Sequence, residues 1–356
     1  MNSNKVWGGG EKWHYETALF LDRSGYDVMV ITNNNSDLYK KLQEHPGIRL
    51  HAMRISNFSF LNPFKLFSLC KLFKKYQVTA IILGLSTDVK LGGPAARMAG
   101  VKHIIYRRGS AIPVRNSFFN RYLFQKVLTR IITNSKEISQ NIFERNPHII
   151  DPEKVRIIYN GIDLKQWPGL DYFRKEKDEK ASLILGNAGR LVEQKGQVYL
   201  IQIARLLKER EIPFRLYIAG SGKLKKDLIQ ACKNQELEKE IIFLDFVEDM
   251  RTFLKGLDIY LSTSLHEGSS HVILEAMAAA KPVVAFDVSS MPEMISDKDS
   301  GFLVPFGDVE QFAETIIQLW NDPDKMSRVG ARARNRVEEK FDFSKNIQNV
   351  LKLIEQ

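Results

Sequence analysis

One stretch in the second half of the chain limits most strongly how the chain can fold. Residues 258–264 form a short apolar run with β-branched members, which predicts a buried parallel strand. After the turn at Gly268, the apolar segment 272–277 predicts a buried helix, which Lys281-Pro282 should end before a strand starts at Val283. This strand–loop–helix–strand order predicts a parallel sheet, and such sheets bind ligands at the carboxyl ends of their strands.

Two glutamates stand in this stretch. Glu267 lies in the loop and Glu275 in the predicted helix, with seven residues between them. The start of that helix offers backbone N–H groups and a positive dipole to an anion. Retaining GT-B glycosyltransferases of the family 4 type carry an E-x7-E signature, which this chain resembles in the string EGSSHVILEAMAAAKPVVA. A helix start with ordinary acidic residues is the alternative interpretation.

The resemblance implies an α/β fold of the GT-B type, with two Rossmann-like domains facing across a cleft. It implies that Glu267 holds the donor sugar and that Glu275 binds the ribose hydroxyls of the nucleotide. The helix start at Ser269, Ser270 and His271 would then face the diphosphate. The family often has a second glycine where this chain has Ser270, so the identity of the sugar stays open.

A second motif, GRLVEQKG, follows the predicted strand 183–189 and resembles the family's G-R-L-x-x-x-K-G. There Arg190 and Lys195 would grip the nucleotide diphosphate, because two cations offset the charge that develops on a leaving group. An ordinary basic helix start is less favourable, because cations oppose the dipole at a helix N-terminus. With Glu267, these two cations are the predicted catalytic residues.

The donor base has a weaker signal. In relatives the end of the strand predicted at 241–247 faces the base, which selects Phe246 and Val247 as contacts. The chain has no D-x-D in a suitable context and no His/Cys set, so we expect no metal and no cofactor besides the nucleoside diphosphate sugar donor. The base itself is not determined.

Glycine also marks the amino end. Gly8, Gly9 and Gly10 precede a helix predicted from Glu11, and in the family such a loop lets Gly9 and Gly10 approach the donor phosphates. A central strand normally precedes this loop, and here it is apparently missing. Because its loss would leave unpaired backbone groups in a core, we expect that Met1 is not the natural start or that the chain is truncated.

Arg107 and Arg108 end another predicted strand, where many family members have a histidine near the donor sugar and the acceptor. Guanidinium groups suit bidentate contact with a phosphate or an acidic sugar, which predicts an acceptor site. Ordinary surface charge is the alternative.

The predicted organisation has three parts. Residues 1–163 form an acceptor-binding Rossmann-like domain, and 164–340 form a nucleotide-sugar-binding Rossmann-like domain. A charged linker at 164–180 follows the boundary. The helix in 341–356 would cross back to the first domain, as the resemblance implies.

Charge is unevenly distributed. Residues 1–170 contain 25 Lys and Arg against 12 Asp and Glu, whereas the remainder contains 27 against 30. The basic half predicts an anionic partner, such as an anionic membrane surface or a phosphorylated lipid acceptor, or else a solvated surface. No nucleic acid is expected, because no binding module is recognised. The helix at 63–76 combines aromatics and lysines, which fits either membrane docking or a core helix with lysines along its rim.

The resemblance identifies the chain as a retaining glycosyltransferase. The resemblance implies sugar transfer from a nucleoside diphosphate sugar to a hydroxyl of a saccharide or lipid-linked acceptor, in cell-surface polysaccharide or lipopolysaccharide biosynthesis. A nucleotide-sugar epimerase or hydrolase of the same fold and a non-catalytic binding subunit are the alternatives. Two distant cysteines, and the lack of a signal-peptide pattern or long apolar run, predict a cytoplasmic protein. The basic first half would allow it to lie peripherally on the inner face of the plasma membrane.

Overall fold

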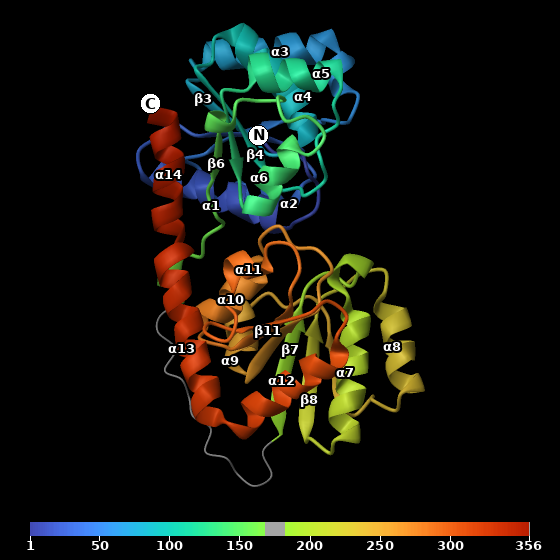
Figure 1. Cartoon of the computed structure of the whole chain (residues 1–356). Coiled ribbons are helices and arrows are strands. Elements are labelled where there is room, and N and C mark those ends of the chain that lie inside the picture. Colours follow the sequence, from blue (N-terminus) through green and yellow to red (C-terminus); the bar gives the residue numbers. More distant parts are fainter. Residues whose placement is uncertain (168–181, 356) are drawn as a thin grey trace. The chain divides into compact units, whose positions relative to one another are not determined.

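The computed structural model describes residues 1–167 and 182–355, which divide into two compact units (Figure 1). Unit 1 comprises Met1–Asn160 and Ile347–Gln356, and unit 2 comprises Gly161–Asn346. The chain therefore passes from one unit to the other three residues before the limit expected from the sequence. Most of the predicted linker, residues 168–180, lies outside the described residues.

Unit 1 is built on parallel strands in two sheets, ordered β1-β2 and β3-β4-β5-β6. The strands are β1 (Met29–Thr32), β2 (Arg49–Ala52), β3 (Ala80–Leu83), β4 (His103–Arg108), β5 (Arg130–Thr133) and β6 (Val155–Ile157). The helices are α1 (Gly9–Arg23), α2 (Asp37–Leu42), α3 (Pro63–Lys75), α4 (Ser86–Ala99), α5 (Phe118–Tyr122) and α6 (Lys136–Phe143), with short helical segments η1 (Ser59–Leu61), η2 (Leu123–Val127) and η3 (Pro152–Lys154). Helix α14 (Phe343–Glu355) begins in unit 2 and continues into unit 1 from Ile347.

Met1 and Asn2 lie between β1 and β3 and form backbone hydrogen bonds with both. The Asn2 N–H donates to the Ile31 carbonyl (3.0 Å), and the Met1 nitrogen donates to the Ile82 carbonyl (2.7 Å). The Gly84 N–H in turn donates to the Met1 carbonyl (2.9 Å). The expectation of unpaired backbone groups is therefore wrong at these positions, because Met1 and Asn2 form hydrogen bonds with residues of both sheets.

Unit 2 holds one parallel sheet of six strands in the order β12-β11-β10-β7-β8-β9. The strands are β7 (Leu183–Ala188), β8 (Phe214–Ala219), β9 (Ile241–Leu244), β10 (Ile259–Ser262), β11 (Val283–Phe286) and β12 (Phe302–Val304). The helices are α7 (Gln197–Glu209), α8 (Lys225–Asn234), α9 (Met250–Lys255), α10 (His271–Ala278), α11 (Met291–Met294), α12 (Val309–Asn321) and α13 (Pro323–Lys340), with η4 (Leu164–Gln166) and η5 (Glu193–Lys195).

Strand apolarity explains why this sheet is sandwiched between helices. β10 and β11 are buried at every position, as expected for strands covered on both faces. Helices α7, α8 and α12 pack together, and α9 and α13 pack on α10 (Figure 1). The chain runs from β7 outward through β8 to β9, then returns to the other edge of β7 with β10. The strand order thus reverses between β7 and β10, the place where doubly wound sheets bind ligands.

Helix α10 ends earlier than the sequence predicts. Its last residue is Ala278, whereas the prediction let it continue to Lys281-Pro282. Ala280 has φ of +53°, a left-handed conformation that closes a helix. Gly330 of α13 packs closely against the Ala280 carbonyl, and a Cβ on residue 330 would clash with it. The glycine therefore leaves room for the turn that ends α10.

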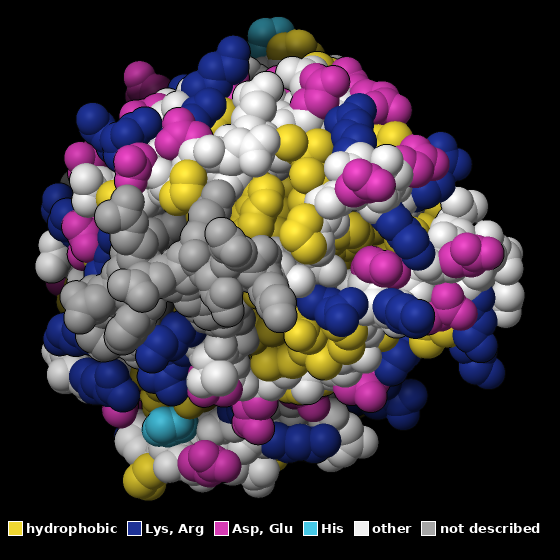
Figure 2. All heavy atoms as spheres, turned by 90° about the horizontal axis from the view of Figure 1, so that it is seen from below, with side chains coloured by type: hydrophobic (Ala, Val, Ile, Leu, Met, Phe, Trp, Pro, Cys, Tyr) yellow, Lys and Arg dark blue, Asp and Glu magenta, His cyan; other side chains and the backbone are white. Residues whose placement is uncertain are grey.

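Two surface properties bear on partners. Within residues 1–167 and 182–355, no helix combines the length and the apolar character needed to cross a bilayer. Figure 2 shows the face seen from below, on which basic and acidic side chains are interspersed around an apolar area.

Candidate functional site

Two loops meet at the point where the strand order of unit 2 reverses. One loop follows β7 and the other follows β10. The Leu265 N–H donates to the Gln194 carbonyl (2.8 Å), and the Gln194 Nε2 donates to the His266 carbonyl (2.9 Å). The Thr263 hydroxyl donates to the Lys195 carbonyl (3.4 Å). The loops are therefore fixed to each other before any ligand arrives.

Gly196 makes this approach possible. It has φ of +60° and ψ of 27°, and it precedes the first residue of α7. A Cβ at this position would lie less than 3.0 Å from the Thr263 carbonyl oxygen. Only glycine satisfies both the backbone conformation and the contact.

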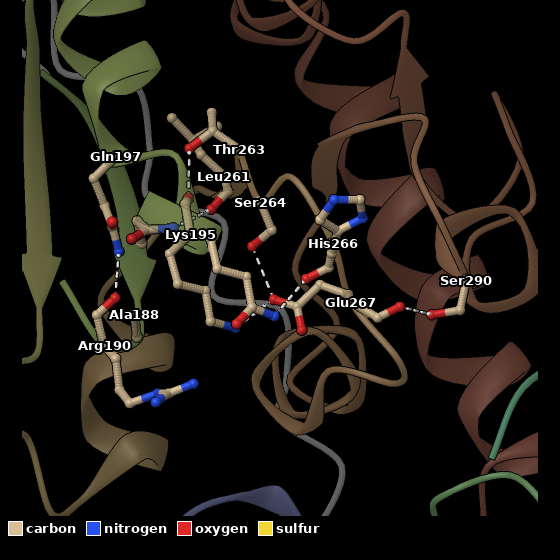
Figure 3. A network of polar contacts seen from close by, with 12 residues as sticks. Ala188, Arg190, Lys195, Gln197, Leu261, Thr263, Ser264, His266, Glu267 and Ser290 are labelled. Atoms are coloured by element: carbon tan, nitrogen blue, oxygen red, sulfur yellow. Dashed lines mark hydrogen bonds and ion pairs between the residues drawn. The ribbon is translucent and has the colours of Figure 1, made fainter. Parts of the chain in front are cut away.

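The centre of the site is an ion pair between the two loops (Figure 3). Lys195 Nζ, after β7, contacts Oε1 of Glu267, after β10. The Ser264 hydroxyl donates to the same oxygen (2.8 Å), and the Ser290 hydroxyl donates to the backbone carbonyl of Glu267 (2.7 Å). Glu267 is buried, so its charge is compensated by the lysine and its orientation is set from three directions.

A buried tyrosine of β10 links this strand to the end of β7, next to the two loops. The Tyr260 hydroxyl donates to the Ala188 carbonyl (3.1 Å) and accepts from the Ala188 N–H (3.2 Å), and Asn187 Nδ2 donates to the Leu261 carbonyl (2.9 Å). Burial, and then the nearby Glu267 and Glu275 carboxylates, raise the pKa of Tyr260. Tyr260 of β10 therefore lies within electrostatic range of both Glu267 and Glu275.

Arg190 belongs to the same loop as Lys195. Its backbone carbonyl accepts from Gln197 Nε2 (3.0 Å), and its side chain is exposed (Figure 3). Arg190 is therefore anchored through its backbone while its guanidinium remains accessible to an anion.

The start of α10 adjoins Glu267. Ser270 precedes the helix without capping it through its side chain, and Ser270 and His271 are both buried. Ser269 lies one residue earlier. Backbone N–H groups in the first turn of a helix are oriented toward a ligand in such an arrangement.

Phe246 and Val247 lie farther from this centre. β9 ends at Leu244, so the prediction that the strand continues to Val247 is wrong. The Gly220 N–H donates to the Asp245 carbonyl (3.1 Å), which replaces the sheet hydrogen bonds at that point. Phe246 is exposed beyond the edge strand, and its contact with a base stays a prediction.

In unit 1, the predicted glycine loop is the beginning of a helix. Gly8 precedes α1, and Gly9 and Gly10 form its first turn. The buried Arg107 lies against this turn, since a Cβ on Gly10 would be 3.7 Å from Arg107 Nη1. Its guanidinium stands over the Trp13 ring (4.9 Å to the centroid).

Asn160 also holds Arg107, accepting from its Nη2 at 2.7 Å. Burial lowers the pKa of Arg107 to about 10. Arg108 is buried as well, and its Nη2 donates to the Ile112 carbonyl. Ordinary surface charge is therefore excluded for both arginines.

Polar residues beside Arg107 complete the cluster. Asn2 Nδ2 donates to Glu11 Oε1 (3.1 Å), and His14 Nδ1 lies 2.9 Å from the Gly10 carbonyl. Burial, followed by nearby positive charge from the chain's amino group and Arg107, lowers the pKa of His14 well below its ordinary value.

Sequence reasoning missed several of these residues. The serines at 264 and 290 and the buried residues Trp13, His14, Glu11 and Asn160 were not selected. Ser264 could have been found, because it ends the apolar run predicted as a strand and precedes Glu267 by three residues. Ser290 and Asn160 had no local signal, since their partners lie far away in the sequence.

No group of three His, Cys, Asp or Glu residues that could hold a metal ion occurs in the described part of the chain. The expectation that the protein works without a metal or further cofactor stays a prediction.

Known families and proteins resemble this chain over nearly its whole length. Residues 7–166 match the model described as glycosyltransferase family 4, and residues 171–336 match that of glycosyl transferases group 1. A relative in Escherichia coli, the UDP-Gal:alpha-D-GlcNAc-diphosphoundecaprenol alpha-1,3-galactosyltransferase, is 25% identical over 93% of this chain and 89% of its own.

A Campylobacter jejuni relative is similarly close. It is the N-acetylgalactosamine-N,N'-diacetylbacillosaminyl-diphospho-undecaprenol 4-alpha-N-acetylgalactosaminyltransferase, 26% identical over 97% of this chain and 96% of its own. Among solved structures, Anabaena HepE in complex with UDP has a TM-score of 0.85 at 20% identity, covering 99% of this chain and 98% of that one.

Proposed function

The chain belongs to the family 4 type of GT-B glycosyltransferases, and from this premise we propose that it transfers a sugar with retention of anomeric configuration. The donor is a nucleoside diphosphate sugar, and the acceptor is a hydroxyl of a saccharide or lipid-linked saccharide. The setting is cell-surface polysaccharide or lipopolysaccharide assembly at a membrane.

One observation carries the proposal. The Lys195–Glu267 pair lies where the strand order reverses, at the carboxyl ends of β7 and β10. An isolated ion pair at this depth gains little stability over apolar packing. A cation and an acid kept there are explained by a ligand that needs both, namely a phosphate next to a hydroxylated ring.

The pair suggests how donor binding proceeds. In the described residues, both side-chain contacts of Glu267 fall on Oε1, which leaves Oε2 to accept from a sugar hydroxyl. An arriving diphosphate competes with Glu267 for Lys195. As Lys195 turns to the phosphate, the carboxylate becomes available to the sugar, still held by Ser264.

Leaving-group stabilisation is the main chemical task. Cleavage of the bond between the sugar and the phosphate puts negative charge on the diphosphate. Lys195, Arg190 and the backbone at the amino end of α10, Ser269–His271, offset that charge. The acceptor hydroxyl then attacks the same face of the sugar that the diphosphate leaves, and its proton passes to the departing phosphate oxygen. Glu275 binds the ribose hydroxyls in this scheme.

Unit 1 has a positively charged element suited to an anionic group of a substrate. Arg107 is fixed between Trp13 and Asn160 beside Gly10, so its side chain loses little freedom when an anion binds. Gly9 and Gly10 present backbone N–H groups at the start of α1. We propose that Arg107 binds this anionic group together with the first turn of α1, and that Arg108 contributes to the neighbouring acceptor-binding site.

The relatives guide the choice of substrates. Two are named for transfer to undecaprenyl diphosphate-linked sugars, and HepE was solved with UDP and with UDP-glucose. We therefore propose a UDP-sugar as the first donor to test and a polyprenyl diphosphate-linked saccharide as the acceptor. The basic first half suits such an anionic acceptor and the membrane that carries it.

The test compares two lysine variants. Lys195→Met removes the cation of the site, whereas Lys208→Met removes a surface lysine at the far end of α7, where it pairs with Glu240 (3.5 Å). Turnover of UDP-, GDP- and ADP-sugars is measured with and without polyprenyl-linked acceptors. We expect Lys195→Met to lose about 10²–10³-fold in turnover, by analogy with the loss of one charge-stabilising donor, and Lys208→Met to match the wild type.

Product analysis separates the alternatives. Nuclear magnetic resonance of the product should show the anomeric configuration of the donor, and turnover should require the acceptor. Acceptor-independent turnover would favour an epimerase or hydrolase, and donor binding without turnover would favour a binding subunit. Wild-type rates in Lys195→Met would contradict the assignment of the site.

A further inference from the structure

A long segment of unit 1 is almost free of acidic residues. Residues 45–136 contain sixteen Lys and Arg and a single acid, Asp88, which is completely buried. Every solvent-exposed charge of this segment is therefore positive. Such a surface attracts anions and repels a second copy of itself.

The same segment exposes large apolar side chains. Phe58, Leu61, Phe64, Phe67 and Phe118 are between 59% and 84% exposed, and we call these five the aromatic surface. Single exposed apolar residues are common on proteins, but a cluster of five large ones indicates a surface that meets an apolar partner.

Helix α3 shows that this exposure is not caused by poor packing. Its inner side is anchored in the core by Leu69 and Phe73. Phe64 and Phe67 are three residues apart and so lie on one side of the helix, where both side chains are exposed to solvent. α3 is therefore a core helix that also exposes two aromatic side chains.

The five members come from segments that touch each other. Phe60 of η1 stacks on Phe119 of α5 with 5.1 Å between ring centroids, and Lys90 of α4 stands over the Phe60 ring (5.8 Å). Figure 1 shows α3, α4 and α5 together at one end of unit 1. The packed Phe60–Phe119 pair thus joins the exposed residues 58–67 to Phe118.

Basic side chains accompany the aromatic surface. Lys71, Lys74 and Lys75 are exposed along the rest of α3, and Arg115 and Arg121 are exposed around α5. The face in Figure 2 differs, because acidic and basic side chains alternate around its apolar area. Aromatic rings insert at the boundary of headgroups and acyl chains, and lysines beside them bind anionic headgroups.

We propose that the aromatic surface docks unit 1 on an anionic lipid bilayer. Phe58, Phe64, Phe67 and Phe118 enter the interface, and the α3 lysines contact the headgroups. This inference extends the proposed function, because a lipid-linked acceptor resides in such a bilayer. Docking depends on neither donor nor acceptor and can therefore be tested separately.

The experiment measures binding of the full chain to vesicles of phosphatidylcholine alone and with phosphatidylglycerol. Phe64→Ser/Phe67→Ser is compared with Val198→Ser, a control on an exposed apolar residue of α7 in unit 2. We expect binding only to anionic vesicles, weakened about a hundredfold by the double substitution and unchanged by the control. Binding should also decrease with added salt, and Lys71→Glu/Lys74→Glu/Lys75→Glu should abolish it.

Further readouts decide between causes. The melting temperature of Phe64→Ser/Phe67→Ser should equal that of the wild type, because both side chains are exposed. Its turnover with a short, water-soluble acceptor should also be unchanged, so a failure of docking and a failure of the proposed function are distinguishable. Undiminished vesicle binding by the double variant, or wild-type dimers in sedimentation that the double variant does not form, would overturn the proposal.

Discussion

Gly196 offers a direct test of how the two loops of the candidate site are joined. Replacing it by alanine has two separable costs. The left-handed backbone costs an L-residue about 1–2 kcal/mol. The new Cβ meets the Thr263 carbonyl at less than 3.0 Å, and relieving such crowding costs about 1–3 kcal/mol. Gly196→Ala should therefore lower the free energy of unfolding by roughly 2–5 kcal/mol.

Gly307→Ala is the matched control. Gly307 lies in the same unit with φ of +81°, and no atom lies within 4 Å of where its Cβ would be. This variant should lose only the backbone term, about 1–2 kcal/mol. Urea unfolding of both variants, compared with the wild type, isolates the clash as the difference between them.

The clash should also reduce donor binding. Thr263 immediately precedes Ser264, which holds the Glu267 carboxylate. Calorimetric titration with UDP should show weaker binding to Gly196→Ala and unchanged binding to Gly307→Ala. Equal stability losses in the two variants, or equal UDP affinities, would refute the reasoning that a close contact at Gly196 joins the loops.

Three further outcomes follow from the structure. His14→Gln should make the protein less sensitive to acid. Burial lowers the pKa of His14, so below about pH 6.5 the unfolded state binds a proton that the folded state does not. In urea melts, the free energy of unfolding of the wild type should therefore decrease with falling pH more steeply than that of the variant, by up to about 1.4 kcal/mol per pH unit. Tyr260→Phe leaves the Ala188 N–H and carbonyl without their partner, which should cost about 1–3 kcal/mol in thermal unfolding. Glu267→Gln should lower the turnover number more than the donor affinity, whereas Ser264→Ala should have the smaller effect on both in steady-state kinetics.

The fold was largely predictable from sequence. The strand expected at 183–189 corresponds to β7 (Leu183–Ala188), and the helix expected at 63–76 corresponds to α3 (Pro63–Lys75). These elements have strong apolar periodicity and clear ends, such as the Asn62 cap of α3. The short helices α2, α9 and α11 were not predicted, because four to six residues provide too little periodicity.

The site was predictable only where each residue stands within a recognisable sequence motif. Lys195 and Glu267 were selected from separate motifs, and the structure brings them into contact. The environment of Arg107 was not predictable, because Trp13, Gly10 and Asn160 are distant in the sequence and meet only in the folded unit. Likewise, the short pairing of Met1 and Asn2 between two sheets depends on strands formed by residues far along the chain.

The central claim is that the loops after β7 and β10 hold the donor diphosphate. Hydrogen–deuterium exchange with and without a UDP-sugar tests it most directly, because it locates the ligand within the intact chain. The account predicts protection of residues 189–197 and 264–275, lost in Lys195→Met, with unchanged exchange at 205–213 at the far end of α7. Protection confined to other segments, or identical protection in Lys195→Met, would contradict it.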